Sequence, residues 1–379
     1  MSQGVAVQDN VKPASPWRCE PSFREMAVVC LASAAIFVVF TAAMTPYLAL
    51  VEHFGDNPAY MSIAAAIRTW DFHGVFVKHF WGYPYFMAAI SKLTGTSDQT
   101  SLLLVSWLSS LVAVMLAYRL WGGWIATAFA IINFDWYQRS YLGGSEPLFV
   151  ALLFGSFLAI RRDRWLLATL LAALATITRP LAVFLLLGIG LTLLWRRDWT
   201  RLVFSALIGF VVGTLYVIPL ARYFHDPLAT VHSYQSAQAG ATVPLFGIPF
   251  YAIIKGTILY PQPLSNLALT FGWIFLVLIA IVAMLRTNHF RSYAREHVPE
   301  IVFVAPYLLS LYCYNYPVWA RGNFARFAIP IIPFVLLALR RWIPKDRRIL
   351  WALAPVTAML AASSAIGIRN VAHLLRVKG

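Results

Sequence analysis

The sequence predicts an all-α fold, a polytopic bundle of about eleven transmembrane helices with a range of 9 to 13. Composition is the first reason, because the 379 residues are 60% hydrophobic and only 12% charged, about half the charged share of a soluble domain. The second reason is that long apolar runs recur along the chain, with lengths near the roughly 20 residues that cross a bilayer. The third is that basic residues collect between alternate runs, as they do in the cytoplasmic loops of membrane proteins.

The predicted spans follow one another through most of the chain. They cover approximately residues 26–50, 100–118, 122–134, 146–160, 165–178, 181–195, 202–220, 267–285, 300–317, 327–339 and 349–367. Two weaker apolar stretches, 81–93 and 246–260, are expected to form short, re-entrant or interfacial helices. A single transmembrane catalytic domain, residues 26–367, therefore separates a tail of residues 1–25 from a shorter tail of residues 368–379.

The strongest basic clusters all fall on one side of the predicted membrane. They are RRDR at 161–164, RRDWTR at 196–201, RTNHFRSYAREH at 286–297 and RRWIPKDRR at 340–348. The positive-inside rule makes this side and the N-terminal tail cytoplasmic, and the two long loops, 51–99 and 221–266, extracytoplasmic. The net charge of +15 follows from this asymmetry, so membrane lipid is an expected partner and nucleic acid is not.

The stretch EHFGDNPAY at 52–60 places an acidic residue just beyond the first predicted span. Asp56 should lie near the extracytoplasmic membrane–water boundary, partly shielded from water. A carboxylate held there is suited to act as a general base on a hydroxyl group. From position alone, an ordinary solvated loop acid is an equal alternative.

Aromatic side chains crowd the segment KHFWGYPYFMAAISKLTG at 78–95. Trp81, Tyr83 and Tyr85 are candidates to stack on sugar rings or to pack against an isoprenoid chain. The alternative is the aromatic belt that membrane proteins carry at the membrane–water interface.

A second acidic segment is NFDWYQRSYLGGSEPLFVALLF at 133–154. Asp135, Arg139 and Glu146 bracket its Gly-Gly turn. Ser145 is expected to cap a helix that begins at Glu146, and an acid has an electrostatic reason to lie at a helix N-terminus. This local role is favoured for Glu146, and a catalytic role is the alternative.

Three arginines lie where the apolar pattern makes a charge expensive. Arg179 stands between two apolar runs, with Pro180 breaking the helix after it. Arg321 and Arg326 lie in a short extracytoplasmic loop, where two guanidinium groups are suited to hold a phosphate. The alternatives are that Arg179 reaches out to the lipid headgroups and that the other two bind anionic headgroups.

Motifs of several other enzyme classes are absent from the sequence. It contains no Walker motif, no GxGxxG and no GxSxG elbow. The eight His and three Cys residues lack the spacing of metal ligands, and the predicted extracytoplasmic segments contain no DxD pair. No cofactor is therefore expected, and a divalent metal is not indicated.

Taken in order, the candidate motifs resemble those of the GT-C superfamily of integral-membrane glycosyltransferases. They are GDxxxY with IA at 55–64, YPYF at 83–86, SEPLF at 145–149, TRP at 178–180 and RFAIPIIPF at 326–334. The sequence looks closest to the bacterial relatives of the GPI mannosyltransferases and of the lipid-A and protein O-glycosyltransferases. It departs from many of them in the first loop. In those relatives this loop carries paired acids, whereas in this sequence the nearest acidic residues to Asp56 are Glu52 and Asp71.

The resemblance implies a sugar donor carried on polyprenyl phosphate and transfer at the extracytoplasmic face. The catalytic acid would be Asp56, and the second acid of the family would be Asp135 or Glu146. Tyr60, with the aromatic residues of 78–95, would contact the sugar or the lipid. The donor phosphate would be held by arginine side chains: Arg321, Arg326, Arg179 and Arg139.

The resemblance thus implies an inverting, mannosyltransferase-like enzyme of the bacterial inner membrane, with a lipid, glycan or protein hydroxyl as acceptor. A membrane transporter or flippase for a lipid-linked or polar substrate is the alternative from another class. Such a protein would show an internal repeat and broken helices at corresponding positions of its halves, and no repeat is visible in the sequence. A lipid-binding or assembly subunit without chemistry is a third possibility.

Overall fold

The computed structural model describes residues 51–75, 77–236, 244–260, 264–317 and 322–342, with scattered positions in 23–38 and 348–366. Within these ranges the regular structure is helical, apart from one isolated antiparallel bridge between Phe246 and Tyr314. The all-α prediction is therefore confirmed for the described residues. The first predicted span, 26–50, and both predicted tails fall mostly outside them.

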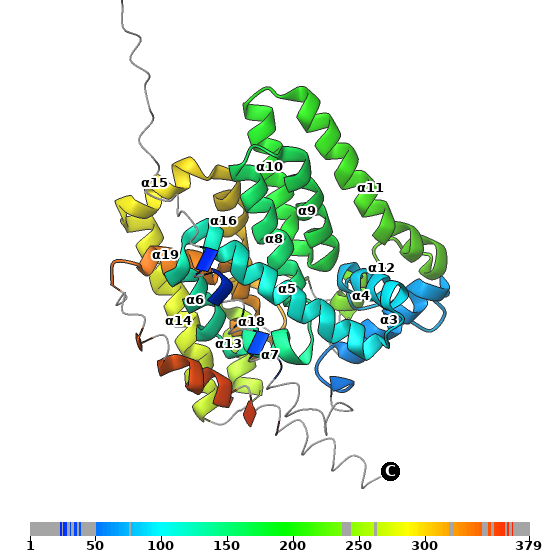
Figure 1. Ribbon diagram of the computed structural model, residues 1–379, viewed down its shortest axis with the longest axis horizontal. Coiled ribbons are helices and arrows are strands. Elements are labelled where there is room, and N and C mark those ends of the chain that lie inside the picture. Colours follow the sequence, from blue (N-terminus) through cyan, green and yellow to red (C-terminus); the bar gives the residue numbers. More distant parts are fainter. Residues whose placement is uncertain are drawn as a thin grey trace, which may run out of the picture.

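The centre of the molecule is a bundle of apolar helices (Figure 1). Its members are α5 (Asp98–Trp121), α8 (Glu146–Arg161), α9 (Trp165–Thr178), α10 (Val183–Trp195) and α16 (Val298–Cys313). α5 packs along α8, α8 along α9, and α10 along α16. α8 is the most enclosed, because Phe149, Phe154 and Phe157 are all fully buried, and a helix that is apolar on every face belongs in an interior.

The remaining helices surround this bundle. One flank of Figure 1 holds α6 (Gly123–Ile132), α14 (Leu264–Arg286), α15 (Asn288–Glu296) and α19 (Ile332–Leu339). The other flank holds α3 (Asn57–Thr69), α4 (Gly82–Thr94), α11 (Trp199–Phe224) and α12 (Ala229–Ser236). The shortest elements are α7 (Phe134–Leu142), α13 (Tyr251–Leu259), α18 (Phe324–Phe327) and the 3-10 turns η2 (Pro180–Ala182) and η3 (Ile329–Ile331).

Three helices of the described part are long and apolar enough to cross a membrane: α5, α11 and the Leu267–Arg286 part of α14. α7 and α8 form a fourth if they are one span broken by a bend of 106°. The other apolar helices have 10 to 17 residues, which is about 15 to 25 Å at the rise of an α-helix. The structure therefore supports the coarser prediction, a helical chain with membrane-length helices, and not the count of about eleven full spans.

Glycine and proline account for much of this shortening. Gly122, with a φ of 91°, ends α5 and begins α6, a backbone conformation that favours glycine. Gly143, with a φ of 97°, ends α7, and Pro180 opens a 3-10 turn after α9. The breaks at Gly122 and Pro180 fall at the boundaries between the predicted spans 100–118 and 122–134 and between 165–178 and 181–195.

The turns between α8 and α9 and between α10 and α11 meet at one end of the bundle. Asp163 in the first turn pairs with Arg201 at the start of α11, with 3.0 Å between Oδ2 and Nη1. α15 lies at the same end of Figure 1 as the α10–α11 turn. Several of the basic clusters recognised in the sequence are thus gathered at this end.

A buried network of charged side chains lies at the same end of the bundle. Arg161, at the end of α8, donates from Nε and Nη2 to the Glu300 carboxylate at 2.7 and 2.9 Å. Its Nη1 donates to the Leu120 carbonyl oxygen at 2.7 Å, and Nη2 also donates to the Tyr293 hydroxyl at 2.6 Å. Every nitrogen of this guanidinium is bonded within the protein, so the network joins α5, α8, α15 and α16.

The helices of the two long predicted loops gather at the opposite end. α3 and α4 come from residues 51–99, and α12 and α13 from residues 221–266. Figure 1 shows α3, α4 and α12 far from α15. The predicted loop helices are confirmed in the described ranges, and α3 begins immediately after Asp56.

Candidate active site

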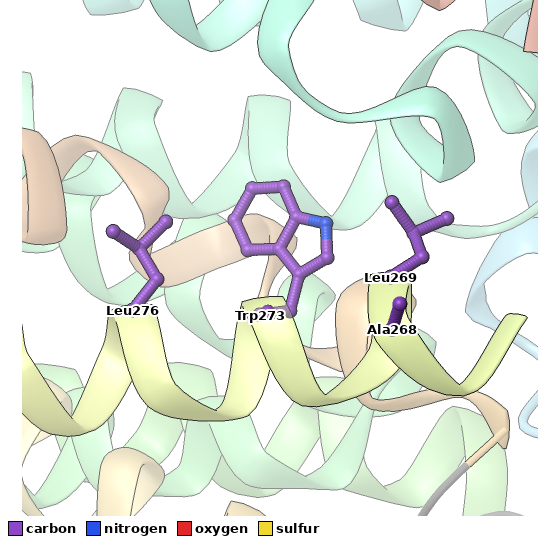
Figure 2. Close-up of a pocket in the computed structure, with 5 residues that line it drawn as sticks. Ala268, Leu269, Trp273 and Leu276 are labelled. Carbon is purple, nitrogen blue, oxygen red and sulfur yellow. The ribbon is translucent and has the colours of Figure 1, made fainter. Parts of the chain in front are cut away.

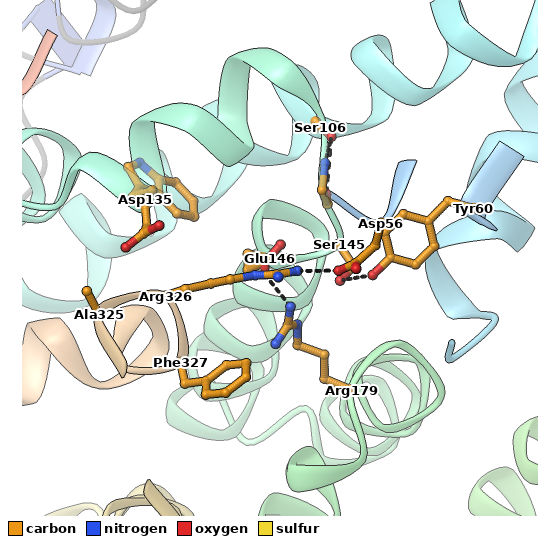
Figure 3. A network of polar contacts seen from close by, with 12 residues as sticks. Asp56, Tyr60, Ser106, Asp135, Ser145, Glu146, Arg179, Ala325, Arg326 and Phe327 are labelled. Carbon is orange, nitrogen blue, oxygen red and sulfur yellow. Dashed lines mark hydrogen bonds and ion pairs between the residues drawn. The ribbon is translucent and has the colours of Figure 1, made fainter. Parts of the chain in front are cut away.

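Three charged side chains from distant parts of the chain meet around Glu146. Arg326 of α18 and Arg179, which follows α9, both donate to Oε1 of this carboxylate. Arg326 also donates from Nη2 to Oδ2 of Asp56 at 2.8 Å. Figure 3 shows the guanidinium of Arg326 reaching between Glu146 and Asp56, with Arg179 beside it. The cluster therefore contains one bridging carboxylate, two guanidinium groups and a second carboxylate at its edge.

Exposure separates the members of this cluster. The side chain of Glu146 is 2% exposed and that of Arg326 is 9% exposed. Arg179 is 18% exposed, and Asp56 is the most open at 30%. A molecule arriving from outside the protein would meet Asp56 and Arg179 before it reached Glu146.

The backbone around Asp56 is held by its neighbour in the sequence. The side-chain amide of Asn57 donates to the carbonyl oxygens of Val51 and Leu142, both at 2.8 Å. Gly55 has a φ of 57°, and a Cβ there would lie 2.7 Å from Nη1 of Arg139. The loop therefore needs glycine at this position, both for its backbone conformation and because Arg139 packs directly beneath it.

Ser145 and Tyr60 join the two acidic loops. The Ser145 hydroxyl lies 3.0 Å from the Tyr60 hydroxyl and makes no capping hydrogen bond to α8. The predicted cap is therefore wrong, because the hydroxyl is turned toward α3. Ser106 of α5 accepts from the Gly144 N–H at 3.1 Å, which fixes the turn just before Glu146.

Arg326 and Arg179 are positioned by contacts of their backbones. The Asn133 amide donates to the Ala325 carbonyl at 2.9 Å, and the Tyr307 hydroxyl to the Phe327 carbonyl at 2.8 Å. Before Arg179, Thr178 packs tightly on α4, because a Cβ on Gly82 would lie 2.6 Å from the Thr178 nitrogen. Close packing of backbone therefore determines where the two guanidinium groups begin.

Several buried polar atoms of the site have no hydrogen-bond partner among the described residues. They are Nε and Nη1 of Arg139, Nε of Arg179 and Oε2 of Glu146. Arg139 stacks its guanidinium on the Phe54 ring, with the centroid at 4.5 Å. Buried polar atoms in native proteins are almost always satisfied by protein, water or ligand, so these atoms are available to bond water or a polar ligand.

The charges around Asp56 change its acidity. Burial alone would raise the pKa of this carboxyl, but the positive charges of Arg326 and Arg139 hold it well below the ordinary value. Burial, with the nearby Asp56 charge, raises the pKa of Tyr60 to about 12, so its hydroxyl is neutral. Burial also lowers the pKa of His79. In the ligand-free protein Asp56 is thus a fixed anion and a weak base.

The structure places the other predicted site residues differently. Asp135, on α7, makes no ion pair among the described residues, and Figure 3 shows it apart from Asp56, at the other side of Arg326. Glu146 rather than Asp135 is the acid that shares Arg326 with Asp56. Arg321 lies outside the described residues.

The aromatic candidates are packed into the protein. Trp81 is fully buried and stacks on Phe72 with a centroid distance of 4.9 Å. The Tyr83 hydroxyl donates to the Leu102 carbonyl at 2.7 Å, and the Tyr85 hydroxyl to the Leu215 carbonyl at 2.5 Å. In this structure these rings hold α4 against its neighbours, and their contact with a sugar or lipid stays a prediction.

Two residues of the site carried no signal strong enough to be singled out. His79 stacks edge-on against Tyr60 with a centroid distance of 5.4 Å, and it was one of eight scattered histidines in the sequence. Asn57 follows Asp56 directly, and its position as the first residue of a helix with Pro58 was the available clue to a structural role. Neither side chain could be placed without knowing which loops meet.

An apolar groove of about 480 Å³ lies along α14. Figure 2 shows Leu269, Trp273 and Leu276 projecting from one side of this helix. α14 packs against α18, which carries Arg326. Within the described ranges, no group of three or more His, Cys, Asp or Glu residues lies close enough to hold a metal ion.

Comparisons with known proteins leave the family open. No protein-family model, no curated protein and no solved structure matches this chain. The resemblance to GT-C glycosyltransferases therefore rests on the sequence motifs alone.

Proposed function

We propose that the protein is an inverting glycosyltransferase that moves a sugar from a polyprenyl-phosphate donor to a hydroxyl acceptor at the extracytoplasmic face of a membrane. Asp56 is the general base, and Arg326 and Arg179 hold the donor phosphate. The acceptor is a hydroxyl of a lipid, glycan or protein. The reaction takes place at the end of the bundle where α3, α4 and α12 gather.

One observation carries the proposal: the most exposed carboxylate of the cluster directly contacts a guanidinium that is paired, through Glu146, with a second guanidinium. Paired guanidinium groups are suited to bind phosphate oxygens. A base that adjoins a phosphate site is the arrangement required to attack a sugar–phosphate bond. The helices of membrane length in the same chain suit a lipid-linked donor.

The transfer step balances with these residues. The Asp56 carboxylate takes the proton from the acceptor hydroxyl while the oxygen of that hydroxyl bonds to the anomeric carbon, on the face opposite the phosphate. The bond between that carbon and the phosphate oxygen breaks, and its electron pair leaves with the polyprenyl phosphate. Arg326 and Arg179 stabilise the negative charge that develops there. The proton passes from Asp56 to water afterwards.

The direct test is to incubate the purified protein with a panel of polyprenyl-phosphate sugars, including mannose, glucose, galactose and arabinose. Release of polyprenyl phosphate that depends on an added hydroxyl acceptor, and a glycosylated product of inverted configuration, are the expected results. If no member of the panel is turned over with lipid, glycan or peptide acceptors, the protein is not a transferase of this class.

A transporter or flippase is the second candidate, and the bend of 106° between α7 and α8 favours it. Broken helices whose ends face a polar site are common in transporters, and Glu146 stands at this break. In proteoliposomes, movement of a lipid-linked sugar between leaflets without cleavage of its sugar–phosphate bond would support this candidate over the transferase.

A further inference from the structure

We propose that Asp56 occupies, in the ligand-free protein, the place on Arg326 that an oxygen of the donor phosphate takes, so that phosphate binding releases Asp56. This inference rests on the proposed function for the identity of the phosphate. It makes Asp56 a competitor of the phosphate for Arg326, and it places donor binding before the release of the base. The base becomes free only when the donor is in place.

The geometry distinguishes a fixed acid from an exchangeable one. Arg326 uses Nε for Glu146 and Nη2 for Asp56. Glu146 is almost completely buried and is shared with Arg179, so its removal would leave Arg179 without its paired carboxylate and Arg326 with Asp56 alone. Asp56 has one bonded oxygen in this cluster and a side chain that is 30% exposed. It is therefore the partner that an incoming anion can replace.

Carboxylate and phosphate oxygens present the same acceptor to a guanidinium. Both are anionic, and both accept charge-assisted N–H bonds of about the same length. A phosphate on Nη2 of Arg326 would also lie toward Arg179, whose Nε has no partner among the described residues. The phosphate would thus gain a second guanidinium that Asp56 does not bond, which favours the exchange.

Release changes the chemistry of Asp56. The charged and titratable groups near it come from several elements: Arg326 of α18, Arg139 of α7, Glu146 of α8, and Lys78 and His79 before α4. The ion pair with Arg326 is one of the interactions that lower its pKa. When the phosphate neutralises that guanidinium, the carboxylate recovers basicity at the moment when an acceptor hydroxyl needs it.

The test uses farnesyl phosphate as a ligand for the full-length protein in detergent. Affinity is measured for the wild type, Asp56→Asn and Glu52→Gln, which removes the same charge from an exposed side chain four positions earlier in the same loop. Exchange predicts that Asp56→Asn binds on the order of ten-fold more tightly than the wild type, because no internal carboxylate must be displaced. Glu52→Gln should bind like the wild type.

Two further ligands show whether the change in affinity depends on the phosphate or on the isoprenyl chain of farnesyl phosphate. Inorganic phosphate has the charge without the chain, and farnesol has the chain without the charge. The gain in Asp56→Asn should appear with both phosphates and not with farnesol. Equal or weaker binding of farnesyl phosphate by Asp56→Asn, or an equal gain for farnesol, would overturn the exchange.

A double-mutant cycle separates exchange from simple repulsion between Asp56 and phosphate. In an Arg326→Gln background no ion pair has to break, so Asp56→Asn should change affinity little. A gain that persists in this background shows that Arg326 is not the shared partner. Should Arg326→Gln fail to fold, infrared difference spectra decide: farnesyl phosphate should shift a carboxylate band that Asp56→Asn lacks, and identical spectra contradict the exchange.

These outcomes are independent of turnover. A tightening in Asp56→Asn without sugar transfer by the wild type leaves the exchange standing for isoprenyl phosphates and removes only the transferase. Transfer by the wild type without the tightening removes only the exchange.

Discussion

Asp56 and Arg326 stand 270 positions apart in the chain, and their carboxylate and guanidinium lie 2.8 Å from each other at one end of a helical bundle. The contact joins the loop before α3 to α18, two segments whose backbones are held separately by Asn57 and by Asn133. Each segment is held by hydrogen bonds that do not involve the ion pair, so the position of each backbone does not depend on the contact between Asp56 and Arg326. Substitutions at either side should therefore alter chemistry more than fold.

Asp56→Asn should abolish sugar transfer, because the amide cannot accept the proton of the acceptor hydroxyl. The measurement is turnover of the polyprenyl-phosphate sugar that the wild type uses. Glu52→Gln is the matched control and should keep near-normal turnover. Near-normal turnover in Asp56→Asn itself would remove Asp56 from the role of base.

Arg326→Ala should lower turnover by about 100- to 1,000-fold, because the substitution removes hydrogen-bond donors directed at the negative charge that develops on the leaving phosphate. Arg326→Lys should recover only part of the rate, since one ammonium cannot bond Asp56 and Glu146 with the fixed fork of a guanidinium. Arg68→Ala is the control, as Arg68 pairs with Asp98 on a partly exposed surface. If Arg326→Ala keeps both donor affinity and turnover, the phosphate is held elsewhere.

Glu146→Gln should destabilise the protein, because two guanidinium groups would lose the buried carboxylate that they share. Breaking a buried ion pair in this way costs about 3 to 5 kcal/mol. Thermal unfolding in detergent measures the effect, with the exposed Glu296→Gln on α15 as the reference. An unchanged unfolding temperature would mean that Glu146 is not the electrostatic link between Arg179 and Arg326.

Gly82→Ala should displace the end of α9, because its Cβ would lie 2.6 Å from the Thr178 nitrogen. Overpacking of this kind costs about 1 to 3 kcal/mol, and the shift of Arg179 should weaken donor binding as well. Gly190→Ala, on α10, is the matched control, because nothing lies within 4 Å of its Cβ position and alanine favours helix. Similar unfolding temperatures for the two variants would contradict the close packing at Gly82.

The stability of the protein should depend on pH through Asp56. Its pKa in the folded protein lies below the ordinary value of 3.8, so the unfolded chain binds a proton first as pH falls. The stabilisation is complete above the ordinary pKa and is lost as pH falls below it. The difference in unfolding temperature between the wild type and Asp56→Asn should therefore be constant from about pH 6 to about pH 5 and narrow as pH falls from about 4 to about 3; a difference that stays constant throughout would exclude this linkage.

Much of the helical framework was predictable because apolar runs report burial in lipid or protein directly. The helices α5, α8, α9, α11 and α14 lie close to the expected ranges. The break at Gly122 was also predictable, because it falls at the boundary between the expected spans 100–118 and 122–134. Whether a short apolar helix crosses a membrane depends on its neighbours, which a linear pattern does not contain.

The site was predictable as a set of residues and not as a set of pairs. Asp56, Arg179 and Arg326 stood out because ionisable residues beside apolar runs are expensive. That Glu146 accepts from both arginines depends on which helix ends meet, over separations of 33 and 180 positions. For the same reason Ser145 was expected to cap its own helix, whereas its hydroxyl bonds Tyr60 of another one.

The hydrogen bonding of Arg161, at the far end of the bundle, can be compared with that of the arginines in the candidate site. All three of its nitrogens donate to described protein oxygens, with four hydrogen bonds among them. Arg139 and Arg179 are surrounded by carboxylates and are nevertheless unsaturated within the described residues. The arginines at the two ends of the bundle therefore differ: Arg161 has a protein partner at each nitrogen, whereas Arg139 and Arg179 keep N–H groups that can bond water or a ligand.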